Sequence, residues 1–133
     1  MIKLFIGAKG SGKTKTLIEL VNSAAVTSKG SVVCIEKGDK LIHDVTYKAR
    51  LIDTDDYAIY DAEALYGFIS GILASNSDIT DIFVDSSLKI CGNDVPAFES
   101  MLPKLEKISE GVNIVMSSSI SVEEAPEGIK KYV

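Results

Sequence analysis

The feature that most restricts the fold of this 133-residue chain is a glycine-rich segment near its amino end, Gly7 to Thr14 (GAKGSGKT). It fits the pattern G-x-x-x-x-G-K-[ST] without a mismatch. The apolar run Ile2 to Ile6 before it indicates a buried strand, and residues 12–28 after it carry apolar side chains at helical spacing. A strand, a glycine loop and a helix in this order are typical of a loop that binds phosphate.

Each residue type in this loop has a physical reason. Glycines let the backbone turn tightly and approach phosphate oxygens closely, so that loop amides point inward. Lys13 supplies a full positive charge, and the hydroxyl of Thr14 suits Mg²⁺. The sequence therefore predicts the following nucleotide-binding residues: Gly7, Ala8, Lys9, Gly10, Ser11, Gly12, Lys13, Thr14 and Lys15.

The rest of the chain alternates strand and helix patterns. Further strands are predicted at residues 31–36, 81–85 and 112–117, and helices at 61–74 and 95–109. Strands that alternate with helices of this length indicate a parallel sheet with helices on both faces. The predicted fold is α/β, a three-layer α/β/α P-loop fold with a mainly parallel sheet of about five strands in one domain, residues 1–133.

Two segments are less regular. Apolar and polar side chains alternate within residues 37–60, which predicts an extended arm or hairpin, with a turn at 53–56 and a short strand at 57–60. His43 in this segment is expected to be a surface residue. Residues 119–133 are predicted to form a polar tail with a short edge strand at 129–133.

Ligands of parallel sheets bind beyond the carboxyl ends of the strands, so the polar residues there are candidate site residues. Asp85 follows three apolar residues at such an end and is predicted to hold Mg²⁺ with Thr14. Glu36 ends another strand; it is a candidate catalytic residue, with an ion pair to a nearby lysine, Lys37 or Lys40, as the alternative. The candidate catalytic residues are Lys13, Glu36 and Asp85, and the candidate γ-phosphate sensors are Ser117 and Ser118.

Composition excludes several functions. The net charge is −5 and the basic residues are scattered, so a nucleic-acid partner is not expected. Cys34 and Cys91 have no CxxC spacing, which favours buried reduced thiols over a zinc site. No apolar run approaches the length of a membrane span and no leader pattern is found, so a cytoplasmic location is expected.

Together, the loop at residues 7–14, Glu36 and the pair Asp85-Ser86 resemble the RecA-like branch of P-loop nucleoside triphosphatases over about residues 1–118. The resemblance implies Mg²⁺ and ATP as ligands, with GTP left open. It implies that Glu36 activates water, that Asp85 holds Mg²⁺, and that Ser117 or Ser118 lies near the γ-phosphate. It also implies another strand between the first strand and the strand that ends in Asp85.

Members of that branch complete their site with an arginine or lysine from a neighbouring subunit. The candidates here are Arg50, Lys130 and Lys131, which would make the chain part of a homo-oligomer or a complex with a protein partner. A weak ATPase and a nucleotide-dependent assembly or regulatory subunit without turnover are both consistent with these residues. A small-molecule kinase is a further alternative, since the core is distantly similar to type II thymidine kinases. A GTPase is disfavoured because no Asn-Lys-x-Asp element follows a late strand.

Overall fold

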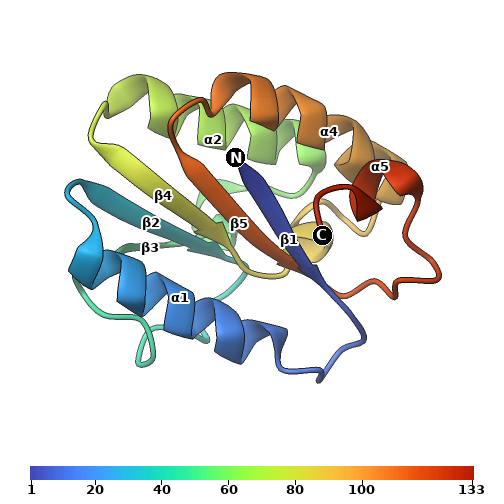
Figure 1. Cartoon of the computed structure of the whole chain (residues 1–133), viewed down its shortest axis with the longest axis horizontal. Helices are drawn as coiled ribbons and strands as arrows, with labels where there is room; N and C mark the ends of the chain where they lie inside the picture. Colours follow the sequence, from blue (N-terminus) through green and yellow to red (C-terminus); the bar gives the residue numbers. More distant parts are fainter.

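The computed structural model describes residues 1–133 as one five-stranded sheet with helices on both faces (Figure 1). The strands are β1 (Ile2–Ile6), β2 (Ser31–Glu36), β3 (Arg50–Asp53), β4 (Ile79–Val84) and β5 (Asn113–Ser118). The helices are α1 (Lys13–Thr27), α2 (Ala62–Ser75), α3 (Ser87–Ile90), α4 (Val95–Ile108) and α5 (Glu127–Lys130), and Thr54–Tyr57 form a 3-10 turn. None of these helices has the length and apolar character that crossing a membrane requires.

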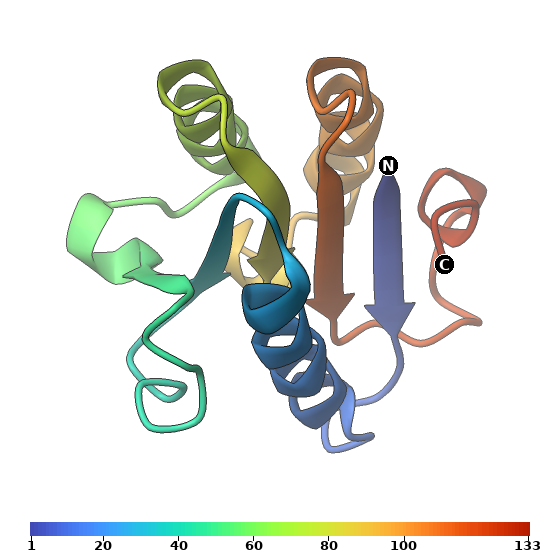
Figure 2. The ribbon, with the colours of Figure 1, turned by 60° about the vertical axis from the view of Figure 1, so that its left-hand side comes forward.

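The strand order is β1-β5-β4-β2-β3, and every neighbouring pair is parallel. The predicted α/β class and parallel five-stranded sheet are therefore confirmed. Helix α1 covers one face, whereas α2 and α4 lie side by side on the other, consistent with three layers (Figures 1 and 2). Strand β5 lies between β1 and β4, the place at which the resemblance implied a further strand.

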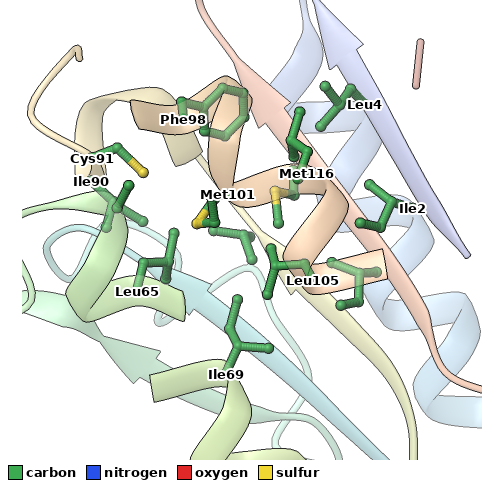
Figure 3. Close-up of a cluster of buried hydrophobic side chains, with 14 of the residues drawn as sticks. Ile2, Leu4, Leu65, Ile69, Ile90, Cys91, Phe98, Met101, Leu105 and Met116 are labelled. Atoms are coloured by element: carbon green, nitrogen blue, oxygen red, sulfur yellow. The ribbon is translucent and has the colours of Figure 1, made fainter. Parts of the chain in front are cut away.

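Side chains of successive strand residues point to opposite faces, which divides the core into two clusters. The larger cluster packs beneath α2 and α4, where Leu65, Phe98 and Leu105 meet the sheet (Figure 3). The smaller one includes Val32 and Cys34 of β2 and lies beneath α1. Both cysteines are free and buried, as predicted, and burial raises the pKa of each thiol to about 12, so they stay protonated.

The prediction of an arm or hairpin for residues 37–60 is wrong. Turns fill residues 37–49, and β3 then pairs in parallel with β2 at the edge of the sheet, whereas a hairpin needs antiparallel strands. Val45 and Ala49 anchor the turns by packing into the cluster beneath α1, and His43 is exposed as expected. The predicted strand at 57–60 is also absent, because the chain is in a 3-10 turn and coil there.

The prediction of an edge strand at residues 129–133 is wrong as well. The short helix α5 forms instead, and a single bond, from the N–H of Leu4 to the carbonyl of Tyr132 (2.8 Å), joins this tail to β1. The tail is not simply polar, because Ile120, Ile129 and Tyr132 are buried. Four helical residues are too few to produce a recognisable periodicity, which is why the sequence pattern missed this element.

Gly30 joins α1 to β2 at a point of close backbone approach. A Cβ at this position would overlap the backbone carbonyl oxygen of Asp78, which also accepts the N–H of Ser31 (2.7 Å). Because this contact involves backbone on both sides, we expect Gly30→Ala to destabilise the fold by about 1–3 kcal/mol in chemical denaturation. The matched control is Gly67→Ala on α2, where a Cβ meets open space and should stabilise the fold by about 0.5–1 kcal/mol. Equal stability of the two variants would contradict the packing at Gly30.

Candidate functional site

The glycine loop connects β1 to α1 with a backbone that favours glycine. Gly10 and Gly12 have φ angles of +84° and +89°, in the left-handed region where other residues are strained. The first helical hydrogen bond of α1 runs from the N–H of Thr16 to the carbonyl of Gly12. The amides of residues 13–15 precede it and form the positive end of the helix, which is suited to an anion.

Lys13 folds back over this loop. Its Nζ donates to the carbonyl oxygens of Gly7 (3.1 Å) and Ala8 (2.8 Å), and to Oγ of Ser11 (3.3 Å). The ammonium group is therefore held against the backbone of the loop. A full positive charge and the amides of the helix end are thus combined within a few residues.

The alternation of the strands places the candidate polar residues on one face. On β2, Val32 and Cys34 face α1, so Glu36 faces the same side. Asp85 follows Phe83 and Ser117 follows Val115 with the same spacing; Phe83 belongs to the cluster beneath α1, and Val115 packs against it. The three polar side chains therefore lie at the carboxyl ends of neighbouring strands, on the face of the sheet that α1 covers.

The loop and a distant strand end meet directly. The hydroxyl of Thr14 donates to Oδ1 of Asp85 at 3.0 Å, across 71 residues of sequence. Asp85 is held beside β2 because its N–H donates to the carbonyl of Ile35 (2.8 Å). The structure thus brings together the two residues that were predicted to hold Mg²⁺.

Ser117 and Ser118 take different positions. Ser117 Oγ donates to Oδ1 of Asp85 at 2.7 Å and accepts the N–H of Ser86 at 2.9 Å. Ser118 is fully buried, and its hydroxyl lies 2.6 Å from that of Ser87. Because Ser87 donates its hydrogen to the carbonyl of Ser117 (3.0 Å), Ser118 must donate to Ser87. Only the first of the two candidate sensors therefore lies with Asp85.

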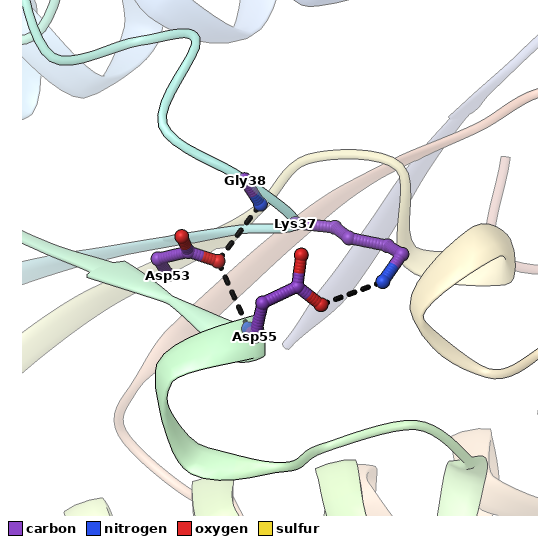
Figure 4. Close-up of polar contacts among 4 residues, drawn as sticks. All are labelled: Lys37, Gly38, Asp53 and Asp55. Atoms are coloured by element: carbon purple, nitrogen blue, oxygen red, sulfur yellow. Dashed lines mark hydrogen bonds and ion pairs between the residues drawn. The ribbon is translucent and has the colours of Figure 1, made fainter.

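Glu36 is 2% exposed and has no cationic partner. Its two carboxylate oxygens each lie 3.3 Å from the N–H of Leu41, so the turn after β2 folds back over the side chain. Burial raises the pKa of this carboxyl, and the carboxylates of Asp53 and Asp85 raise it further, while the Leu41 amide acts in the opposite direction. Lys37 pairs with Asp55 instead (2.6 Å, Figure 4), so the predicted alternative of a Glu36 ion pair is wrong.

Asp53 is a further polar residue at the carboxyl ends of the strands, and the sequence pattern missed it. It ends β3 directly opposite Glu36 in the strand register. Its Oδ1 accepts the N–H groups of Gly38 (2.8 Å) and Asp55 (2.9 Å), which fixes the turns on either side (Figure 4). The rule of polar residues at strand ends would have found Asp53, but β3 itself was interpreted as part of an arm.

The candidate trans-acting cations have no contact with Glu36, Asp85 or Ser117 in their own chain. Arg50 begins β3, so it is at the amino end of the sheet, opposite to the loop. Lys130 pairs with Glu127 (3.8 Å), and Lys131 lies over the ring of Tyr132.

No model of a known protein family matches this chain, and no curated protein is similar to it in sequence.

Proposed function

We propose that this chain is a Mg²⁺-dependent ATP-binding protein with a P-loop fold, and a weak RecA-like ATPase that hydrolyses the γ-phosphate. GTP is the alternative nucleotide. The observation that carries the proposal is the hydrogen bond between Thr14 and Asp85, because it joins the glycine loop to the one strand end that the motif requires. We include a cytoplasmic location, since free buried cysteines are typical of reducing compartments.

The loop residues have the chemistry to hold a triphosphate. The amides at the start of α1 have no acceptor within the helix, and the helix dipole favours negative charge at this end. Lys13 can transfer its hydrogen bonds from the carbonyls of Gly7 and Ala8 to phosphate oxygens, because its flexible stem carries a point charge. In this proposal residues 7–15 form the nucleotide-binding segment.

Thr14 and Asp85 fit a magnesium site. A hydroxyl and a carboxylate are hard oxygen ligands, and one or two of these suffice when water and substrate phosphates complete the shell. No group of three or more His, Cys, Asp or Glu side chains is arranged to hold a metal ion unaided. Bound Mg²⁺ would neutralise charge on the β- and γ-phosphate oxygens.

Glu36 is the residue of this site best suited to accept a proton from water. The raised pKa of its carboxyl is closer to neutral pH than that of an ordinary glutamate. A general base works best when its pKa is near the operating pH, because it is then both deprotonated and basic enough to take a proton. Glu36 also lacks the ion pair that would lower its basicity. We therefore assign it the role of base, opposite the metal-binding Asp85 on the adjacent strand.

One observation favours a second function, a nucleotide-dependent assembly or regulatory subunit without turnover. The N–H of Leu41 lies against both oxygens of Glu36, and the carboxylate is buried beneath residues 37–41. A base held in this way must be released before it can meet water. If nothing releases it, nucleotide binding alone would be the output.

Phosphate release from ATP and from GTP separates these functions. It should be measured with Mg²⁺ at several protein concentrations, beside the Lys13→Ala variant and together with nucleotide binding. Release above that variant supports the ATPase, and a rate that rises more than linearly with protein indicates that subunits complete the site. Binding without release supports the regulatory subunit. Absence of both binding and release would contradict the proposed function.

A further inference from the structure

We propose that Ser117 is a positioning residue for the metal-binding carboxylate: its hydroxyl fixes Asp85 through Oδ1 and leaves Oδ2 available to Mg²⁺. This inference rests on the proposed function of the same site. It assigns Ser117 a different role from that of a γ-phosphate sensor, since the residue acts through Asp85.

The direction of the Ser117 hydrogen bonds is fixed by its neighbours. A backbone N–H can only donate, so the bond from Ser86 (2.9 Å) occupies an acceptor position of Ser117 Oγ. The single hydroxyl hydrogen then goes to Oδ1 of Asp85 at 2.7 Å. Ser117 is 2% exposed, so water competes little for either bond.

Asp85 receives both of its side-chain hydrogen bonds on one oxygen. Thr14 and Ser117 donate to Oδ1, from α1 and β5 respectively, and no protein group donates to Oδ2. Two donors from different elements fix the orientation of a carboxylate more firmly than one. Thr14 is itself a proposed metal ligand, so Ser117 is the donor whose contact does not depend on the bound ion.

The backbone around Ser117 is built to keep this geometry. Strands β4 and β5 pair in register, with Val84 opposite Met116, which brings the next residues of each strand together. Ser86 has a φ of 53°, a left-handed conformation that is uncommon outside glycine and concentrated at functional sites. In this conformation its N–H meets Ser117 Oγ, while the Ser87 hydroxyl holds the Ser117 carbonyl (3.0 Å).

Groups that orient a metal ligand typically change metal affinity about 10- to 100-fold when they are removed. The test is a titration of Mg²⁺ at a fixed concentration of a fluorescent ATP analogue, with a parallel measurement in EDTA. We expect Ser117→Ala to raise the Mg²⁺ concentration for half-maximal enhancement of binding about tenfold or more. The affinity in EDTA should stay within about twofold of wild type, because the loop amides and Lys13 are unchanged.

Three variants make the result specific. Ser119→Ala, at an exposed serine two residues away, should match wild type. Ser117→Thr should restore the Mg²⁺ response, because it keeps the hydroxyl. If the alanine variant does not fold, Ser117→Cys serves instead, since a thiol of similar size is a weaker donor and should shift the response in the same direction.

A double-mutant cycle adds an independent test, because residues that act through one another are not additive. In an Asp85→Asn background, Ser117→Ala should cause no further loss of the Mg²⁺ response. An unchanged Mg²⁺ response of Ser117→Ala, or additive losses in the cycle, would overturn the role of Ser117 and leave the nucleotide site standing. A wild-type chain that binds no nucleotide would overturn both proposals.

Discussion

Replacement of Lys13 by alanine is expected to weaken the binding of MgATP about 10- to 150-fold. A hydrogen bond to a charged group contributes about 1.5–3 kcal/mol, and each 1.4 kcal/mol is a factor of about ten in affinity. Lys13 is the cation that the structure holds at the loop carbonyls of Gly7 and Ala8, where phosphate oxygens would take over its bonds. Isothermal titration of each protein with MgATP measures the change.

The control for this variant is Lys29→Ala. Lys29 is exposed between α1 and β2, at the amino ends of the strands, whereas the loop lies at their carboxyl ends. Its removal should therefore leave the affinity at the wild-type value. Both variants carry the same loss of charge, which separates a local contact from a general electrostatic effect. Equal affinities of wild type and Lys13→Ala would contradict the phosphate-binding role of the loop.

Replacement of Glu36 by glutamine is expected to lower the rate of phosphate release about 100-fold or more while MgATP affinity stays within about twofold. General bases contribute about 10²- to 10⁴-fold, and glutamine keeps the size of the side chain but cannot accept the proton. Single-turnover measurement of phosphate release gives the chemical rate without product release. Glu110→Gln, at an exposed glutamate before β5, should turn over at the wild-type rate. A Glu36→Gln variant as fast as wild type would remove Glu36 from the mechanism.

The same substitution should also change the dependence of stability on pH. The pKa of Glu36 is raised in the folded protein above its ordinary value of 4.5, so the unfolded chain loses this proton first as the pH rises. The contribution of Glu36 to wild-type stability therefore falls as the pH rises from 4.5 to the higher pKa of the folded state, and it is lost above that pKa. Glu36→Gln should be more stable than wild type at pH 8 and equal near pH 4 in urea denaturation. A stability difference between Glu36→Gln and wild type that does not vary with pH would contradict the raised pKa of Glu36 in the folded protein.

The parts of this fold that could be predicted are those whose pattern is local. The strand, glycine loop and helix of residues 2–28 follow one another without interruption, and Asp61 begins α2 as predicted by accepting the N–H of Ala64 (2.8 Å). Alternation along the buried strands is enough to place Asp85 on the face that carries the loop. The meeting of Asp85 with Thr14 follows from these local signals and the rule for strand ends.

The elements that could not be predicted depend on tertiary contacts. Strand β3 has four residues, and only the free edge of β2 makes them a parallel strand. Because β3 was missed, Asp53 was interpreted as part of a turn, although it lies opposite Glu36. Helix α5 likewise has four residues, and the burial of Ile129 within it results from packing against the rest of the chain.

Residues 7–15 are proposed to bind the phosphates of a nucleotide, and a ¹⁵N–¹H correlation titration with MgATP would show this binding residue by residue. We expect the largest changes in amide shift in residues 7–15, with further changes at Asp85 and at Ser86, whose N–H donates to Ser117. An apolar groove between α1 and the sheet, lined by Leu20, Ala24, Phe83 and Val115 among others, offers an alternative place for a ligand. No shift on addition of MgATP, or shifts confined to that groove, would contradict phosphate binding by residues 7–15.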